Sequence, residues 1–428
     1  MDLQEQYNGF FTRFKRLAND KGFWTFVTDH IADNISKLRL KYQRLEDDID
    51  YPMALTQIEC RQRFGAKFAE TLSRVPYLLF PDELVGEQAT SDRLARYHAS
   101  LVEPGSRVVD LTAGLGIDLM HIAERGCNVA AVELDPRRAA ALAVNLELLG
   151  VKPTAIVCGD CRDVLGQLDA DVVFIDPARR AMDGSRVFSL HDCAPDVTEI
   201  YDELRHRFKR LFVKISPMLD ISAVASELPG LKTMSAVGTP TECRELLSDC
   251  NLRDENIGDT YHIYSVTLTD NGEMIFTYSP EQESEAEITY GSPKIGDDVY
   301  IPFPVMMKSG AVKLIAARYG LTKIAPNTHI YFRQASTNVN GMNTEAQDQS
   351  LEYDDIQAVK LKVIDIIPWQ SKQLKRFSSR YPRGWVATRN MGVTAQELAK
   401  KLSVKPGGDL RILGLTDNSG SRLVLVLK

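Results

Sequence analysis

Three acidic residues stand at the ends of short apolar runs that are well separated along the chain. Asp110 ends RVVD, Glu133 ends NVAAVE, and Asp160 follows TAIVCG. Carboxylates accept strong hydrogen bonds from ammonium, hydroxyl and amino groups. Each acid alone could be an ordinary turn or capping residue, but the three together favour one site for a polar ligand.

The residues after Asp110 have the composition of a ligand-binding loop. They read LTAGLGID over 111–118, so a strand would end, Gly114 and Gly116 would let the backbone turn close to a ligand, and a helix would begin. Such loops bind nucleotides or their analogues. A dinucleotide-binding loop would have a third glycine where Leu119 stands, so the pattern departs from NAD binding.

Glu133 and Asp160 suit other parts of a nucleoside. An acid 17 residues after Gly116 can accept hydrogen bonds from both ribose hydroxyls, and Asp160 is placed to accept one from an adenine amino group. Asp135 and Pro136 favour the capping and first positions of the next helix.

Five apolar runs that could be buried strands alternate with helical segments. The runs are RVVDL, NVAAVEL, TAIVCGD, DVVFIDP and LFVKISP, and helices would begin near Asp118, Pro136 and Asp196. This alternation predicts a parallel sheet with helices on both faces, whose ligands lie beyond the carboxyl ends of the strands. The fold class is α/β, with this domain over residues 96–270.

The rest of the chain divides into further regions. Residues 1–95 have apolar positions at helical spacing and predict a helical N-terminal region. After residue 270 the alternation stops, and the polar stretch 336–350 separates a small unit over 271–335 from a basic unit over 356–428. The basic unit ends in two strands around a turn at 418–420, which predicts a small α+β domain.

These motifs resemble those of the class I S-adenosylmethionine (SAM)-dependent methyltransferases. The whole layout is similar to the bacterial methyltransferases with a THUMP-like C-terminal domain, through DLTAGLGID, VELDP, DPARR, VKISPMLDI, TECREL, KSGAVKLIA and NTHIYF. The resemblance implies a Rossmann-like domain, then a ferredoxin-like and a THUMP-like domain, with SAM as cofactor and RNA as partner. One departure is YIPFPVMMKSGA at 300–311, where relatives tend to have a Pro-Asn pair.

The resemblance also implies which residues bind the cofactor. The strand-end acid would face the ammonium of the methionine moiety, the glycines would leave room for the adenosine moiety, and residues 88–91 would lie over the cofactor. The expected cofactor-binding residues are Gln88, Asp110, Thr112, Gly114, Gly116, Asp118, Glu133 and Asp160.

Asp176, Pro177 and Arg179 are the expected catalytic residues. Class I enzymes that methylate nucleobase amino groups usually carry Asp/Asn-Pro-Pro-aromatic after the fourth strand, and this chain has Asp-Pro-Ala-Arg. A carboxylate that accepts hydrogen bonds from an exocyclic amino group keeps the nitrogen lone pair out of the ring and aims it at the methyl group. The missing proline and aromatic residue leave amino-group methylation plausible.

Other residues near this site allow further chemistry, and each also has a simpler interpretation. Arg179 and Arg180 could hold a phosphate or form salt bridges within the protein. A ring-carbon methyltransferase would need a cysteine nucleophile, for which Cys193 and Cys243 are candidates, but lone cysteines are more often small buried residues. The CxxC pair at 158–161 has no second pair at metal-ligand spacing, so no metal is expected.

The C-terminal unit is basic, although the whole chain carries a net charge of −7. Residues 356–428 have 14 Lys and Arg against 4 Asp and Glu, while the other 355 residues have 37 against 54. Cations interleave with Trp369, Phe377, Tyr381 and Trp385, which suits RNA phosphates and unpaired bases. The alternative is that the aromatic residues form a core and the charges a solvated face. The expected RNA-binding residues are Lys372, Lys375, Arg376, Arg380, Arg383 and Arg389.

The composition of the chain favours a location of the protein inside the cell. Seven scattered cysteines indicate reduced thiols, and no apolar run reaches the roughly 18 to 20 residues that span a bilayer. We expect a cytoplasmic methyltransferase that modifies a nucleobase in RNA. A small-molecule or protein methyltransferase, whose basic unit docks on its own acidic body, and a non-catalytic SAM-binding module are the open alternatives.

Overall fold

The computed structural model describes residues 2–42, 48–179, 189–253, 260–334 and 356–428. The chain forms two compact units, residues 1–234 with 245–259 and residues 235–244 with 260–428. The polar stretch 336–350 lies outside the described residues. Among the described residues, no helix is long and apolar enough to cross a membrane.

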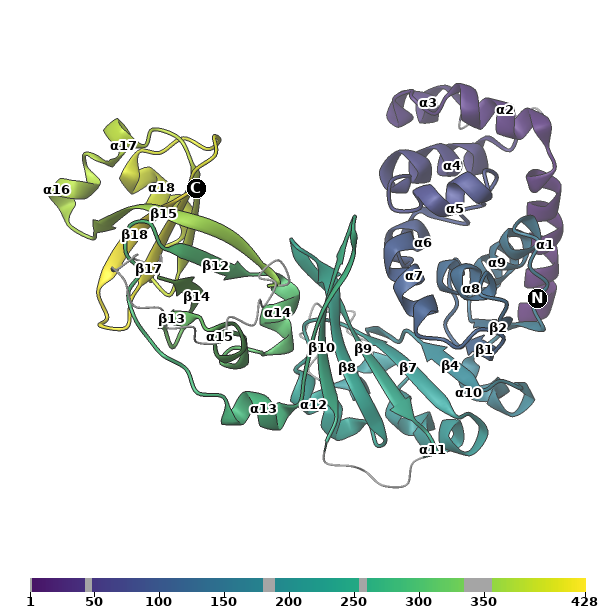
Figure 1. The fold of residues 1–428 in the computed structure, drawn as a ribbon. Helices are drawn as coiled ribbons and strands as arrows, with labels where there is room; N and C mark the ends of the chain where they lie inside the picture. Colours follow the sequence, from purple (N-terminus) through teal and green to yellow (C-terminus); the bar gives the residue numbers. More distant parts are fainter. Residues whose placement is uncertain (1, 43–47, 180–188, 254–259, 335–355) are drawn as a thin grey trace. The chain divides into compact units, whose positions relative to one another are not determined.

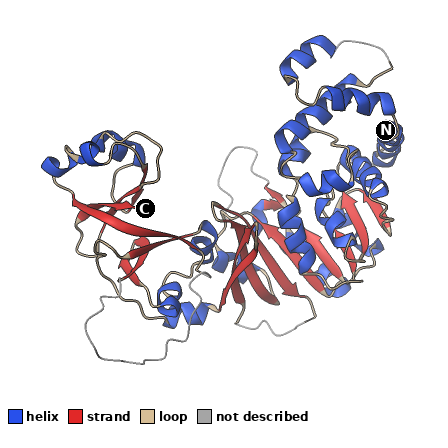
Figure 2. Cartoon of the chain, turned by 45° about the horizontal axis from the view of Figure 1, so that its top comes forward, coloured by secondary structure: helices blue, strands red, loops and turns tan. Residues whose placement is uncertain are grey.

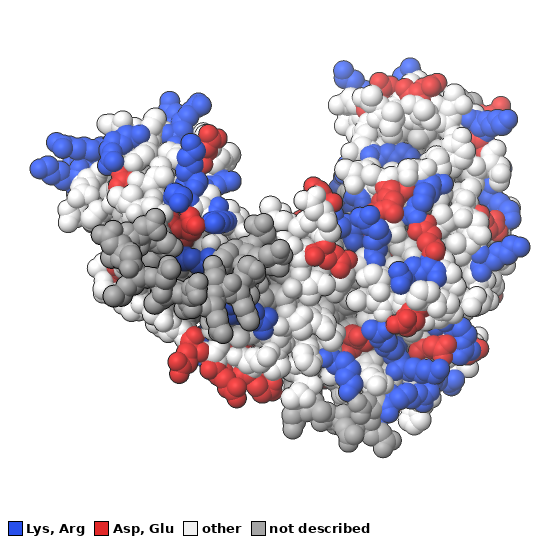
Figure 3. All heavy atoms as spheres, viewed as in Figure 1, with Lys and Arg blue, Asp and Glu red and all other residues white. Residues whose placement is uncertain are grey.

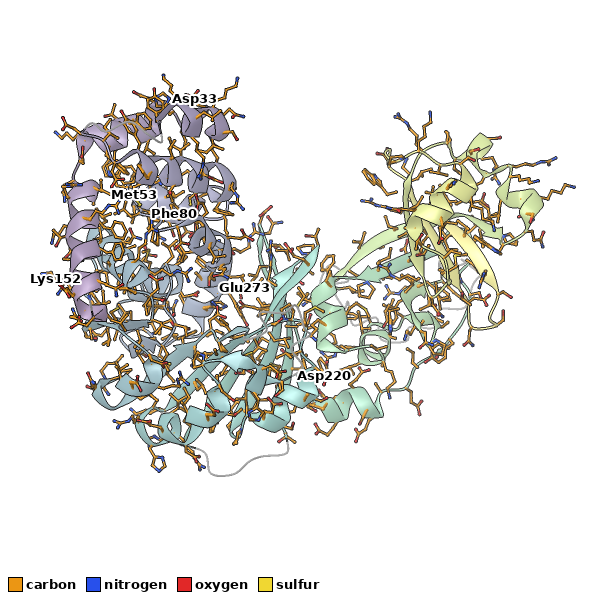
Figure 4. All side chains as sticks on the ribbon, turned by 180° about the vertical axis from the view of Figure 1, so that it is seen from behind. Asp33, Met53, Phe80, Lys152, Asp220 and Glu273 are labelled. Carbon is orange, nitrogen blue, oxygen red and sulfur yellow. The ribbon has the colours of Figure 1, made fainter. Side chains whose placement is uncertain are left out.

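The first unit begins with a helical region, as predicted (Figure 1). Side chains at helix starts explain several boundaries, because Asp2, Asp50 and Ser91 each accept a hydrogen bond from a backbone N–H in the first turn. Figure 4 shows side chains filling the space between these helices, where Met53 and Phe80 are buried. The helices are α1 (Leu3–Ala18), α2 (Lys21–Asp29), α3 (Ile35–Tyr42), α4 (Tyr51–Phe64), α5 (Ala69–Arg74), α6 (Glu83–Gln88) and α7 (Asp92–Ser100).

The five predicted strands form the parallel part of a nine-stranded sheet, from β7 to the edge strand β3. They are β1 (Arg107–Asp110), β2 (Asn128–Glu133), β3 (Ala155–Cys158), β4 (Val172–Ile175) and β7 (Arg210–Ile215). The intervening helices are α8 (Ile117–Ala123), α9 (Pro136–Leu148), α10 (Cys161–Val164) and α11 (Val197–Arg207), and α12 (Ile221–Glu227) follows β7. Figure 1 shows α8 and α9 on one face of this sheet and α11 and α12 on the other. The predicted α/β fold is thus confirmed.

The strand order places a switch point beside β1. The sheet runs β11-β10-β8-β9-β7-β4-β1-β2-β3, and β1 pairs in parallel with both β2 and β4. The chain therefore leaves β1 toward β2 on one side and later returns to β4 on the other, which opens the carboxyl ends of these strands to a ligand. The further strands are β8 (Leu231–Thr239), β9 (Glu242–Asn251), β10 (His262–Thr269) and β11 (Gly272–Tyr278), and β9 runs antiparallel to β7.

The second unit contains a seven-stranded sheet with the order β13-β14-β12-β15-β18-β17-β16 (Figure 2). The predicted C-terminal strand pair is present as an antiparallel hairpin of β17 and β18. The strands are β12 (Asp298–Pro302), β13 (Thr322–Ala325), β14 (Thr328–Arg333), β15 (Ala358–Pro368), β16 (Trp385–Arg389), β17 (Arg411–Thr416) and β18 (Arg422–Leu427). The helices are α13 (Pro280–Glu285), α14 (Pro304–Ser309), α15 (Leu314–Tyr319), α16 (Ser371–Leu374), α17 (Phe377–Arg380) and α18 (Ala395–Leu402).

Candidate active site

The glycine loop after β1 is held by Glu133 at the end of β2. The Gly114 N–H donates to Glu133 Oε2 at 2.8 Å, and the Asp135 N–H donates to Oε1 at 2.9 Å. Gly116 has a φ of 81°, and a Cβ there would stand 2.1 Å from Leu142 Cδ1 of α9. This position therefore requires glycine for both its backbone conformation and its close packing. The buried Glu133 fixes the loop and the start of α9 at the same time.

Asp110 is a buried carboxylate at the end of β1. It accepts a hydrogen bond from the Thr112 N–H at 2.9 Å. Burial raises the pKa of Asp110 to about 7, since desolvation outweighs that hydrogen bond and nearby Asp118 acts in the same direction as burial. A cationic group placed beside Asp110 would favour its charged form. The side chain thus suits the ammonium of an amino acid moiety.

Thr112 links the ends of β1 and β4. Its hydroxyl accepts a hydrogen bond from the Asp176 N–H at 2.7 Å. Asp176 follows β4, its side chain is 50% exposed, and its Oδ2 lies 2.8 Å from Lys214 Nζ. Pro177 after it is buried. The expected nucleophile-positioning residue is therefore attached through Thr112 to the expected cofactor loop.

Asp118 belongs to a buried group of charges at the start of α8. Asp118 Oδ2 accepts from Thr90 Oγ1 at 2.6 Å and from Lys214 Nζ at 3.1 Å, and its Oδ1 lies 2.8 Å from His98 Nδ1. Lys214 and His98 hold the pKa of Asp118 far below its usual value despite its burial. Both carboxylate oxygens thus have protein partners, and a role for Asp118 in cofactor binding stays a prediction.

Asp160 and Gln88 lie apart from these contacts. The Asp160 carboxylate caps α10 and pairs with Arg162 at 2.6 Å, which lowers the pKa of Asp160. Gln88 is exposed at the last residue of α6. Their expected roles toward adenine and cofactor stay predictions. Asp160 does act as a helix-capping residue, which was the simpler interpretation of this acid.

Arg179 is described only through its backbone, which pairs with Cys193 in the short β5–β6 sheet of Ala178–Arg179 and Cys193–Ala194. Arg180 lies outside the described residues. Cys193 is buried, and Cys243 Sγ lies 3.8 Å from the Val237 carbonyl oxygen. Among the described residues, no group of three or more His, Cys, Asp and Glu is arranged to hold a metal ion.

Three contributors to the buried group were not predicted from the sequence, namely Thr90, His98 and Glu245. His98 lies on α7, and its Nε2 is 2.5 Å from Glu245 Oε1 on β9. Thr90 and Glu245 stand in segments that carried the family resemblance, residues 88–91 and TECREL. Their pairing could not be inferred, because 147 residues separate His98 from Glu245 along the chain.

The basic C-terminal region carries its cations on the surface. All six expected RNA-binding residues are exposed, and Figure 3 shows Lys and Arg gathered at the end of this region that carries α16 and α17. Within the described part of the chain, Arg380 is the one of these six residues that forms an ion pair. A guanidinium nitrogen of Arg380 lies 2.8 Å from Asp365 Oδ2.

The interleaved aromatic residues are mostly part of the core. Phe377 is fully buried, and Trp369 and Tyr381 pack against the same apolar cluster as Leu398. Trp385 alone of the four expected aromatic residues is exposed, at 50%. For Phe377 the alternative that these aromatic residues form a core therefore holds.

Two family models match segments in the C-terminal part of the chain. Residues 299–338 match a family model described as a ferredoxin-like domain, and residues 358–428 match one described as THUMP domain-like. A crystal structure of a proposed methyltransferase from Porphyromonas gingivalis W83 has a TM-score of 0.81 at 24% identity, covering 97% of this chain and 98% of that one. This likeness shows the fold.

Sequence relatives carry methyltransferase names. An uncharacterized SAM-dependent methyltransferase of Mycobacterium tuberculosis (strain CDC 1551 / Oshkosh) is 28% identical over 275 residues, 62% of this chain and 69% of the relative. Ribosomal RNA small subunit methyltransferase J of Rhodopseudomonas palustris (strain HaA2) is 41% identical over 98 residues, 19% of this chain and 45% of the relative. The comparisons confirm the predicted resemblance: this chain is a SAM-dependent methyltransferase of the class I fold with a THUMP-like C-terminal domain.

Proposed function

We propose that this methyltransferase transfers a methyl group from SAM to an exocyclic amino group of a base in RNA. The observation that carries the proposal is the placement of Asp176. Its half-exposed carboxylate follows β4 at the switch point, and its backbone N–H is bonded to the glycine-loop residue Thr112. A carboxylate in this position can accept hydrogen bonds from an amino group and hold the nitrogen toward the cofactor.

The residues around β1 and β2 fit SAM, which supplies an electrophilic methyl group when bound. Asp110 would pair with the ammonium of the methionine moiety, Glu133 would accept from the ribose hydroxyls, and Gly114 and Gly116 would leave room for the adenosine moiety. The buried Asp110, whose pKa of about 7 would fall beside a cation, supports the first of these roles. At Gly114 the nearest atom to a Cβ would be the Thr112 carbonyl oxygen, 4.0 Å away, and this open space supports the last of these roles.

Two features support RNA as the substrate. Exposed Lys and Arg side chains of residues 356–428 can neutralise phosphates, and that segment matches the THUMP-like model. The match to a ribosomal RNA methyltransferase in Rhodopseudomonas palustris points to the same class of substrate. The RNA-binding roles of Lys372, Lys375, Arg376, Arg380, Arg383 and Arg389, and a cytoplasmic location, belong to this proposal.

A transfer assay tests the function. Purified protein is incubated with radiolabelled SAM and, separately, with total RNA, total protein and small molecules from cells that lack this enzyme. We expect label in RNA, and digestion to nucleosides should place it on a base amino group. Label found in protein or small molecules, with none in RNA, would favour the alternative of a basic region that serves only for docking.

A further inference from the structure

Lys214 lies on β7, and its ammonium group is buried among acceptors. Nζ contacts Thr90 Oγ1 at 2.7 Å, Asp176 Oδ2 at 2.8 Å and Asp118 Oδ2 at 3.1 Å. A lysine ammonium has three N–H donors, and these three acceptors occupy them. Lys214 is therefore not disposed to hold a substrate directly, and its influence on the reaction must pass through the groups that it contacts.

The side chains behind Lys214 form a chain of alternating charge. Asp118 contacts His98 Nδ1, and His98 Nε2 contacts Glu245. Burial alone would lower the pKa of His98, but the charges of Glu245 and Asp118 outweigh it and raise the pKa to about 10, so His98 is a cation at neutral pH. Glu245, His98, Asp118 and Lys214 thus alternate in sign, and their charges cancel.

Asp176 stands at the exposed end of this chain of charges. The four side chains behind it are buried, whereas its own side chain is half exposed. Asp110 also interacts electrostatically with Lys214, and burial raises the pKa of Asp110 to about 7, so this carboxyl is partly protonated at neutral pH. Asp176 is therefore the half-exposed carboxylate of this cluster, where a substrate can reach it.

We infer that Lys214 is a positioning residue, which fixes the orientation of the Asp176 carboxylate for the incoming amino group and is itself held by Asp118, Thr90 and the His98–Glu245 pair. This inference rests on the proposed function, since it assumes that Asp176 receives the substrate. A half-exposed aspartate without this contact would sample several rotamers, and the productive one would be populated only part of the time.

A double-mutant cycle tests the inference. Lys214→Met removes the ammonium but keeps a side chain of similar length, and Asp118 keeps its contacts with His98 and Thr90. We expect Lys214→Met to lower the single-turnover methylation rate by about tenfold or more, with the affinity for S-adenosylhomocysteine changed less than about twofold. In an Asp176→Ala background, the same substitution should cost less than about twofold, because its effect passes through Asp176. Lys214→Arg should restore part of the rate.

A matched control comes from the same strand. Arg210 at the start of β7 pairs with Asp249 of β9 at 2.7 Å, far from the strand ends that carry the site. Arg210→Met removes a partly buried ion pair and should therefore lower the melting temperature. The single-turnover rate of this variant should nevertheless stay within about twofold of the wild-type rate. If Arg210→Met lowered the rate as much as Lys214→Met does, the effect of Lys214→Met would be explained by lost stability alone. That result would overturn the inference.

The remaining outcomes separate the inference from the function on which it rests. Losses from Lys214→Met and Asp176→Ala that multiply in the double variant would show that Lys214 acts independently of Asp176. A crystal structure of the wild-type protein in which Asp176 points away from Lys214 would overturn the inference whatever the substrate. Wild-type protein that methylates no RNA base would instead defeat the proposed function, and the inference with it.

Discussion

The strand-end site of the first unit and the basic surface of the second hold their charges in opposite ways. In the first, Asp110, Asp118 and Lys214 are buried and bonded to named partners. In the second, the cations at 372–389 are exposed on the surface. Fixed, desolvated charges suit the alignment of reacting atoms, whereas exposed surface cations suit a phosphate backbone of any sequence. In our proposal, the first region carries the chemistry and the second captures the substrate.

Removing the Asp176 carboxylate should have the largest effect. Asp176→Ala should lower the single-turnover methylation rate by about a hundredfold or more, because the amino group loses its acceptor. The affinity for S-adenosylhomocysteine should stay nearly unchanged, since the buried groups at β1 and β2 are untouched. Rapid-quench kinetics and calorimetry give the two values. A fully active variant would move the chemistry to another residue, with Cys193 and Cys243 next to test.

Charge reversal on the basic surface should affect capture and leave the chemistry intact. Replacing Lys375 and Arg376 by Glu should weaken binding to every RNA sequence alike, by about tenfold or more at low salt. Each lost phosphate contact should reduce the slope of log affinity against log salt by about 0.7 to 0.9. Filter binding across a salt series measures both.

The same double reversal at the exposed Lys21 and Lys37 of the N-terminal helices serves as the control, because it changes net charge equally. It should leave the salt slope as in wild type. If the region 356–428 served only for docking, the Lys375 and Arg376 reversal would lower the melting temperature and RNA binding would be weak from the start.

Cofactor affinity should respond to pH through Asp110. Its folded pKa of about 7 is raised by burial, so the carboxyl carries its proton below that pH and loses it above. An ammonium ligand prefers the deprotonated form, and SAM should bind about tenfold more tightly at pH 8 than at pH 6. Asp110→Asn should flatten this dependence in calorimetry. An equally steep dependence in the variant would assign the titration to another group.

Glu133 should show the smallest of these effects. Glu133→Ala removes the acceptor for the Gly114 and Asp135 N–H groups and, in our proposal, for the ribose hydroxyls. The binding free energy of S-adenosylhomocysteine should weaken by more than about 1 kcal/mol, measured by calorimetry. Unchanged affinity would remove Glu133 from the cofactor site. Tight NAD binding with no response to S-adenosylhomocysteine would contradict the family itself.

The two regions also differ in how much the sequence could predict. Asp110, Glu133 and Asp176 were located because apolar runs mark buried strands, and the carboxyl ends of parallel strands meet at one edge of a sheet. The His98–Glu245 contact depends on how a helix and an antiparallel strand pack across the fold, and no local pattern encodes it. The burial of Phe377 could not be decided from the sequence for a related reason, since its helix of four residues is too short to show which face is buried.

The most direct test of the account is nucleoside mass spectrometry on RNA from cells that lack this methyltransferase. One base carrying a methylated amino group should be absent from their RNA. Wild-type protein should restore it, and Asp176→Ala should not. An unchanged nucleoside profile in cells without the protein, together with a methylated protein or small molecule that disappears, would contradict the account.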